Sequence, residues 1–230
     1  MSDNQYGFSS SPKKRIIIVE DHPIFRLGLA ELINQEEDLF VCGEAEDVTK
    51  AWNEIKRLSP DMVIADISLK GRSGIELIKD ISKHFSTLPI LVLSMHDESL
   101  YAERALLAGA KGYIMKQEAS ESIVKAIRCV LNGKIYASER IMANILNKFV
   151  SQPGMQDKPS IDRLTDRELE VFHFIGQGLT TREIAEKLNL SKKTIGTYRE
   201  RIKEKLCLKN AAELIRFAVH WVKNENEETR

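Results

Sequence analysis

Short apolar runs alternate with amphipathic stretches over the first 130 residues of the chain. Between the runs, apolar residues recur at helical spacing, as Phe25, Leu29 and Ile33 do. Continuous apolar strands separated by helices are typical of a parallel sheet that is buried on both faces. The pattern therefore predicts a doubly wound α/β domain over residues 13–131. Its five parallel strands are expected at residues 15–20, 39–44, 61–66, 89–94 and 111–116.

Strand-like runs stop after the fifth strand. One amphipathic helix is expected at 138–149, and the polar segment 151–160, with two prolines and a glycine, has the composition of a linker. The rest of the chain has helical periodicity, with helices expected at 166–176, 181–188, 192–206 and 211–222. The predicted organisation is a flexible tail (1–12), the α/β domain (13–131), a linker helix with a flexible linker (132–159), an all-α domain (160–225) and a short tail (226–230).

Composition is that of a globular cytoplasmic protein. Hydrophobic residues make up 43% of the chain, and no apolar stretch reaches the roughly 18 residues of a membrane span. The segment 1–11 is polar and lacks the apolar core of a secretory signal. Cys42, Cys129 and Cys207 are widely spaced and odd in number, which favours reduced thiols over disulfides or a metal site.

Charge balances over the whole chain but is unevenly distributed. Residues 13–130 carry 16 lysines and arginines against 19 aspartates and glutamates, whereas residues 182–216 carry 10 against 5. A basic region confined to the helical part suggests a polyanionic partner there. On charge alone, a solvated helix face explains it equally well.

Ionic side chains follow the apolar runs, at the point where each predicted strand ends. In an open parallel sheet these ends meet in one crevice, where ligands bind. Several carboxylates so close together call for a cation, and Mg2+ prefers oxygen ligands. Asp66 is then the natural nucleophile for a phosphoryl group, with Ser94 and Lys116 binding its oxygens. The residues at the strand ends are Glu20, Asp21, Asp66, Ser94 and Lys116.

Taken singly, each of these residues has an ordinary explanation. An aspartate after a strand is most often a turn or capping residue, and Lys116 alone reads as a solvated loop lysine. Their combined order carries the argument: an acid pair, an acid, a hydroxyl and a lysine, each at the end of its own strand.

In this combination, residues 13–131 resemble the receiver domain of bacterial response regulators, which has a flavodoxin-like fold. The resemblance implies that a sensor histidine kinase phosphorylates Asp66. It also implies that Ser94 and Tyr113 form the switch pair. The implied Mg2+ ligands are Glu20, Asp21, Asp66 and the backbone carbonyl of Ser68. Gly74 fits the family pattern, whereas Lys70 stands where the family often has proline.

The helical part predicts a helix-turn-helix motif at about 180–203. Thr165 and Glu168 form a capping-box pattern, and Ser191 caps a long helix that is basic at its N-terminus. Two helices joined by a tight turn, the second of them basic at its N-terminus, suit DNA recognition. Ser191, Lys192 and Lys193 would then lie near a phosphate. An ordinary three- or four-helix bundle is the alternative.

Residues 160–225 also resemble the LuxR-type helix-turn-helix domain of NarL/FixJ-type regulators. Two departures are Gly196, where the family usually has lysine, and Tyr198, where it usually has histidine. The resemblance rests on Leu164-Thr165, Arg167-Glu168, Glu170-Val171, Gly178, Glu183-Ile184-Ala185, Leu188, Leu190-Ser191, Thr194-Ile195 and Lys205-Leu206.

The predicted DNA contacts all lie on the helix at 192–206. Base readout is expected from Thr197 and Glu200, with Gly196 allowing close approach. Phosphate contacts are expected from Lys192, Lys193, Arg199 and Lys203, and Thr194 completes the set. One such domain buries too little surface for selective binding, so a homodimer on double-stranded DNA is expected. In the resting state, the receiver is expected to cover this helix.

The chain is thus predicted to be a phosphorylation-switched transcription factor. It is not an enzyme beyond Mg2+-dependent phosphorylation and dephosphorylation of its own acceptor. RNA polymerase is a further candidate partner. The main alternative is a protein-interaction regulator with weakened DNA binding, and a phosphotransfer enzyme is a weaker one.

Overall fold

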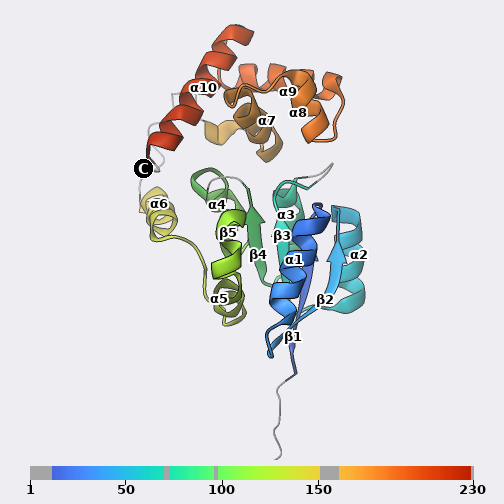
Figure 1. Cartoon of the computed structure of the whole chain (residues 1–230). Coiled ribbons are helices and arrows are strands. Elements are labelled where there is room, and N and C mark those ends of the chain that lie inside the picture. Colours follow the sequence, from blue (N-terminus) through green and yellow to red (C-terminus); the bar gives the residue numbers. More distant parts are fainter. Residues whose placement is uncertain (1–11, 70–72, 96–97, 151–160, 229–230) are drawn as a thin grey trace, which may run out of the picture.

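The structure of the chain is a computed structural model that describes residues 12–69, 73–95, 98–150 and 161–228 (Figure 1). Lys70, one of the departures from the receiver pattern, lies outside these residues. Within them, no helix is both long enough and apolar enough to cross a membrane.

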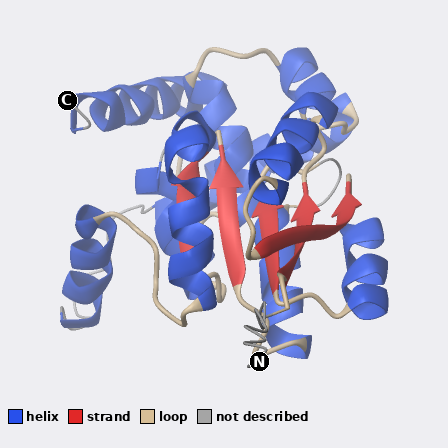
Figure 2. Ribbon diagram, turned by 60° about the horizontal axis from the view of Figure 1, so that its bottom comes forward, coloured by secondary structure: helices blue, strands red, loops and turns tan. Residues whose placement is uncertain are grey.

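A parallel sheet forms the centre of the first domain (Figure 2). It has five strands in the order β2-β1-β3-β4-β5. Every residue of β3 and β4 is buried because helices cover both faces of the sheet. This confirms the predicted doubly wound sheet. The strands are β1 (Lys14–Val19), β2 (Leu39–Ala45), β3 (Met62–Asp66), β4 (Ile90–Ser94) and β5 (Gly112–Met115).

Two separate apolar clusters fix the helices to the two faces. Alternate strand residues point to opposite faces, so Ile16 and Ile18 pack on one side while Ile17 and Val19 pack on the other. The first face is covered by α1 (Pro23–Asn34) and α5 (Ala119–Leu131). The second is covered by α2 (Val48–Leu58), α3 (Gly74–His84) and α4 (Glu98–Leu107).

After α5, the chain returns to the sheet. Tyr136 forms a parallel bridge with Gly112, and its carbonyl accepts a hydrogen bond of 2.8 Å from the backbone N–H of Tyr113. Ser138 then donates to Glu98 Oε1 at 2.7 Å, just before α6 (Glu139–Val150). Part of the predicted linker is therefore built onto the edge of the receiver.

The second domain contains four α-helices and a short 3-10 turn. Side-chain caps start all four of these helices: Thr165 and Thr180 form complete capping boxes with Glu168 and Glu183, Ser191 accepts from the N–H of Thr194, and Asn210 accepts from the N–H of Glu213. The elements are η2 (Ile161–Arg163), α7 (Asp166–Gly176), α8 (Thr181–Lys187), α9 (Lys192–Lys205) and α10 (Ala211–Glu228).

The end of α10 differs from expectation. The sequence predicted a helix to residue 222 and a tail at 226–230, but α10 runs to Glu228. Residues 223–228 contain no proline or glycine, so nothing in them interrupts the helical hydrogen bonds.

The helical domain lies over the carboxyl edge of the sheet (Figure 1). Arg104 of α4 donates to the carbonyls of Leu164 (2.8 Å) and Ile161 (3.1 Å) and lies 3.3 Å from Asp166 Oδ1. Lys79 of α3 contacts Asp166 Oδ2 at 2.9 Å. Two receiver cations therefore hold the start of α7.

Contrary to expectation, the receiver does not cover α9, the predicted recognition helix, which carries the predicted DNA contacts. Lys192, Lys193, Thr197 and Glu200 of α9 are all exposed. The receiver contacts fall instead on η2 and the start of α7, because Arg104 and Lys79 bind there.

Adding a methyl group at Gly74 should disturb the loop that follows β3. A Cβ there would lie 2.1 Å from the Asp66 carbonyl oxygen and 2.6 Å from Ile67 Cα. We expect Gly74→Ala to lower the free energy of unfolding by about 1–3 kcal/mol. Gly28→Ala in α1, where a Cβ meets open space, is the matched control and should raise it by up to about 1 kcal/mol. Equal urea midpoints for the two variants would contradict the close approach.

Removing the Arg104 side chain should loosen the two domains. Arg104→Ala deletes hydrogen bonds to two backbone carbonyls and an ion pair, together worth about 1–3 kcal/mol. Small-angle scattering should then show a larger radius of gyration. Arg57→Ala, which removes an exposed pair within α2, should leave it unchanged. A radius that is unchanged in Arg104→Ala would exclude this interface in solution.

Candidate functional site

The predicted site residues meet at the carboxyl edge of the sheet. Glu20 and Asp21 directly follow β1, Asp66 ends β3, Ser94 ends β4 and Lys116 directly follows β5. All five are buried, and Asp66 is only 2% exposed. The parallel order of the strands brings them together, because it places every strand end at one edge.

Lys116 is the cation at the centre of the site. Its Nζ lies 2.8 Å from Asp66 Oδ2 and 2.5 Å from Glu20 Oε2, and it also sits 4.8 Å from the ring centroid of Phe25. Burial alone would lower the pKa of Lys116, but the two carboxylates outweigh it and raise that pKa. The ammonium is therefore held in its charged form.

Asp66 has both carboxylate oxygens engaged. Oδ1 accepts a hydrogen bond of 3.1 Å from the backbone N–H of Ser68, and Oδ2 contacts Lys116. Burial raises the pKa of Asp66, Lys116 opposes this rise, and the charge of Glu20 adds to it. A bound cation would relieve the repulsion between these carboxylates.

The donor set fits a divalent cation. Glu20, Asp21, His22 and Asp66 each offer a ligand atom, and these atoms all lie within 4.8 Å of one another. Carboxylate oxygens are the ligands that Mg2+ prefers. That the backbone carbonyl of Ser68 binds the cation stays a prediction, because the hydrogen bond of Ser68 to Asp66 Oδ1 uses the backbone N–H instead.

Sequence reasoning missed two residues beside this site. The Nδ1 atom of His22 lies 2.8 Å from both Glu20 Oε1 and Asp21 Oδ1. Arg26, on the first turns of α1, donates to the backbone carbonyl of Glu20 and to Glu44 Oε2. The position of His22 directly after Glu20 and Asp21 could have indicated that it belongs to the site. The contact of Arg26 with Glu44 could not be predicted in this way, because it depends on where β2 lies in the fold.

The predicted switch residues are both inside the protein. Ser94 is fully buried, and Tyr113 packs in the same apolar cluster as Tyr101 of α4. That cluster continues into the helical domain through Leu164 and Leu169. Tyr113 is therefore joined to the domain contact by continuous packing.

A buried ion pair in α7 lies near the acceptor site. Arg167 Nη1 contacts Glu170 Oε2 at 2.5 Å, and the same guanidinium donates to the Leu188 carbonyl. Burial raises the pKa of Glu170, Arg167 opposes the rise, and the charge of Asp66 adds to it. Glu170 is thus within electrostatic reach of Asp66.

The predicted DNA contacts lie along α9, with Ile195 and Ile202 buried behind them. Some of these side chains already have partners: Lys203 Nζ is 2.8 Å from Glu200 Oε2, and Thr197 Oγ1 donates to the Lys193 carbonyl. A Cβ at Gly196 would meet nothing within 4 Å. Gly196 is therefore not required for packing within the chain. The full predicted set is Lys192, Lys193, Thr194, Gly196, Thr197, Arg199, Glu200 and Lys203.

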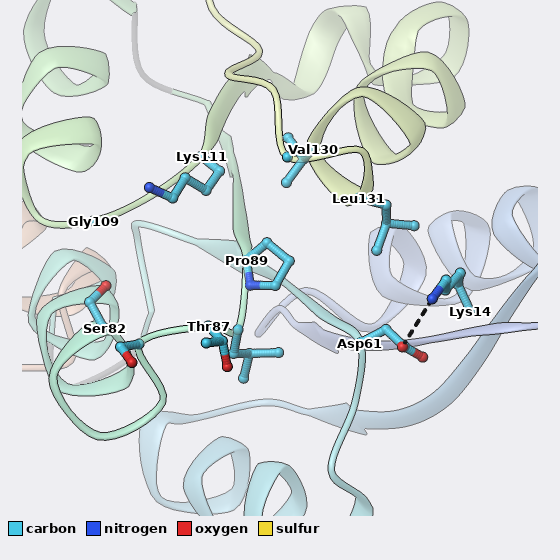
Figure 3. A pocket seen from close by; sticks show the side chains of 12 residues that line it. Lys14, Asp61, Ser82, Thr87, Pro89, Gly109, Lys111, Val130 and Leu131 are labelled. Carbon is cyan, nitrogen blue, oxygen red and sulfur yellow. Dashed lines mark hydrogen bonds and ion pairs between the residues drawn. The ribbon is translucent and has the colours of Figure 1, made fainter.

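A separate hollow of about 430 Å³ lies at the amino ends of the strands, on the side of the sheet away from the acceptor site (Figure 3). It is lined by residues near the starts of strands, among them Lys14, Asp61, Pro89 and Lys111. Lys14 and Asp61 pair with each other at 3.4 Å. Its described lining includes none of the predicted site residues.

Comparisons with known proteins agree with both halves of the chain. The family model "Response regulator receiver domain" matches residues 16–128, and "Bacterial regulatory proteins, luxR family" matches residues 162–218. The oxygen regulatory protein NreC of Staphylococcus carnosus is 34% identical over 209 residues, which cover 89% of this chain and 96% of NreC.

Solved structures of relatives align with this chain over both domains. The RcsB response regulator of Salmonella typhimurium aligns with a TM-score of 0.62 and 30% identity, covering 91% of this chain and 98% of RcsB. RcsB of Salmonella enterica serovar Typhimurium, bound to promoter rprA in the presence of phosphomimetic BeF3-, aligns with a TM-score of 0.58 and 31% identity, covering 90% and 98%. The chain therefore belongs to the two-component response regulators of the NarL/FixJ type, with a receiver domain followed by a LuxR-type DNA-binding domain.

Proposed function

We propose that Asp66 accepts a phosphoryl group from a sensor histidine kinase, and that this controls the binding of a homodimer to double-stranded DNA. The observation that carries the proposal is the Asp66 carboxylate, held between Lys116 and the acid pair Glu20-Asp21 at the strand ends. The proposed boundaries are 13–131 for the receiver and 160–225 for the DNA-binding domain.

Mg2+ is the proposed cation, with Glu20, Asp21, Asp66 and the Ser68 carbonyl as its ligands. When bound, it would offset the negative charge of the carboxylates and the incoming phosphoryl group. An Asp66 oxygen attacks phosphorus while the bond to the kinase histidine breaks, which leaves an acyl phosphate. Lys116 and Ser94 then bind phosphoryl oxygens, and hydrolysis later restores the carboxylate.

Phosphorylation is proposed to act on the contact between the domains. It adds about −1.5 to −2 charges next to Asp66, by analogy with other phosphorylated side chains. The charge of Asp66 already adds to the raised pKa of Glu170, so the added charge should raise that pKa further and disturb the buried pair of Glu170 with Arg167. The Ser94 and Tyr113 switch would act on the same contact, because Tyr113 shares its cluster with Leu164 and Leu169.

DNA recognition is proposed to use α9. Thr197 and Glu200 would read bases while Lys192, Lys193, Arg199 and Lys203 bind phosphates, with Thr194 beside them. Exposure of Lys192, Lys193, Thr197 and Glu200 supports this. A homodimer would supply two half-sites, and RNA polymerase stays a candidate partner.

The open space at Gly196 supports an alternative function, that of a protein-interaction regulator with weakened DNA binding. The chain lacks a cationic side chain where the LuxR-type pattern usually has lysine, and nothing packs into the gap. Weak DNA binding with a role in protein interaction would follow if the remaining cations of α9 do not compensate.

The acceptor is tested by replacing Asp66. We expect Asp66→Asn to abolish radiolabel incorporation from a small phosphoryl donor such as acetyl phosphate, because an amide is a poor nucleophile. Asp38→Asn removes an exposed carboxylate that pairs with Arg128 and is the control, which should label normally. Removal of Mg2+ with a chelator should stop labelling of the wild type. Labelling of a folded Asp66→Asn protein would refute the assignment.

The predicted recognition helix is tested at Gly196. Gly196→Lys should tighten DNA binding and steepen the slope of log K against log salt by about 0.9, because one more phosphate is neutralised. Gly196→Ala is the matched control: it removes the same glycine and gains up to about 1 kcal/mol of helix stability without added charge.

DNA binding measured by fluorescence anisotropy over a series of salt concentrations distinguishes a DNA-binding regulator from a protein-interaction regulator. Equal salt slopes for the lysine and alanine variants would exclude the proposed docking of α9. Absence of DNA binding by the phosphorylated wild type and by both variants would favour the interaction regulator.

A further inference from the structure

We infer that His22 is an additional ligand of the divalent cation, and that it shifts the preference of the site towards first-row transition ions over Mg2+. The inference rests on the metal site of the proposed function and extends it. A site built only from carboxylates and carbonyls favours hard ions, whereas an imidazole nitrogen raises affinity for Mn2+, Co2+ and Ni2+.

The backbone holds His22 beside the acid pair. Its own N–H donates to Glu20 Oε1 at 3.0 Å, and Pro23 follows it as the first residue of α1. A residue before proline is restricted to extended backbone, and His22 has φ −91° and ψ 108°. The side chain makes no capping bond to α1, so its ring is available to the acids.

The spacing of the donor atoms suits a shared cation. Nδ1 of His22 lies 2.8 Å from Glu20 Oε1 and 2.8 Å from Asp21 Oδ1. Adjacent ligands of an octahedral ion, each about 2.1 Å from the metal, lie roughly 3 Å apart. Little movement is therefore needed for the ring nitrogen and both oxygens to bind one ion.

The exposure of the ring gives it a distinct place in the site. The His22 side chain is 66% exposed, whereas those of Glu20 and Asp21 are 2% and 6% exposed. The imidazole thus stands at the entrance, with the carboxylates behind it. Loss of the ring should leave the inner oxygen donors in place, so that affinity for Mg2+ is largely retained.

The test compares two ions by isothermal titration calorimetry. We expect His22→Ala to weaken Ni2+ binding about tenfold and Mg2+ binding less than about twofold. His22→Asn, which offers an amide oxygen in place of the ring nitrogen, should also lose the preference for Ni2+. His220→Ala removes an exposed histidine of α10 and is the control; it should change neither affinity.

Spectroscopy of bound Mn2+ gives a direct readout of the ligand. Electron spin echo modulation should show one nitrogen coupled to Mn2+ in the wild type and in His220→Ala, and none in His22→Ala. Bound Mn2+ without nitrogen coupling, together with parallel losses of Ni2+ and Mg2+ affinity, would mean that His22 only hydrogen-bonds the acids, and would overturn the inference.

The outcomes for the two proposals are separable. Cation binding that lacks nitrogen coupling, with Asp66 still labelled, rejects the role of His22 alone. A wild type that binds no cation and incorporates no label rejects both the metal ligand and the proposed acceptor site.

Discussion

Repulsion among the carboxylates at one edge of the sheet is the constraint on which the site depends. Parallel strands deliver Glu20, Asp21 and Asp66 to the same buried place, where like charges disfavour one another. Lys116 offsets part of that charge through contacts with Glu20 and Asp66, and the acids in turn keep its ammonium charged. The negative charges of the three carboxylates and the positive charge of Lys116 thus set the electrostatic balance at this site, and any added anion or cation must change that balance.

The second domain is placed so that it can respond to that balance. The start of α7 is bound by Lys79 and Arg104, and the buried pair of Arg167 and Glu170 lies within electrostatic reach of Asp66. The apolar core is continuous from the sheet into the helical domain. Lys192, Lys193, Thr197 and Glu200 of α9 stay exposed, so in this arrangement the proposed control does not require that these predicted DNA contacts be covered.

Local patterns predicted the elements and the residues at the strand ends, because apolar periodicity and the residue that follows each apolar run depend only on neighbouring positions. The helix starts at Thr165 and Ser191 follow from capping patterns of a few residues in the same way. Other contacts join segments that are far apart in sequence, and no short sequence pattern predicts them. Examples are the contacts of Arg26 and Arg104 and the bridge of Tyr136 to β5. The expected covering of α9 was wrong for a related reason: the orientation of two domains depends on which surface charges meet, here Arg104 and Lys79 with the start of α7.

The bridge between Tyr136 and Gly112 also sets the length of the tether between the domains. Because the chain from Tyr136 to α6 is attached to the receiver, only residues 151–160 separate α6 from η2. Ten residues span at most about 35 Å, so the helical domain stays close to the receiver even when their contact opens. A short tether gives an effective concentration in the millimolar range, so a contact worth about 4 kcal/mol, more than the Arg104 bonds supply alone, is already half closed. The equilibrium between closed and open forms then depends on tether length as well as on contact strength: doubling this segment would favour the open form by about 0.6 kcal/mol without changing a single interface residue.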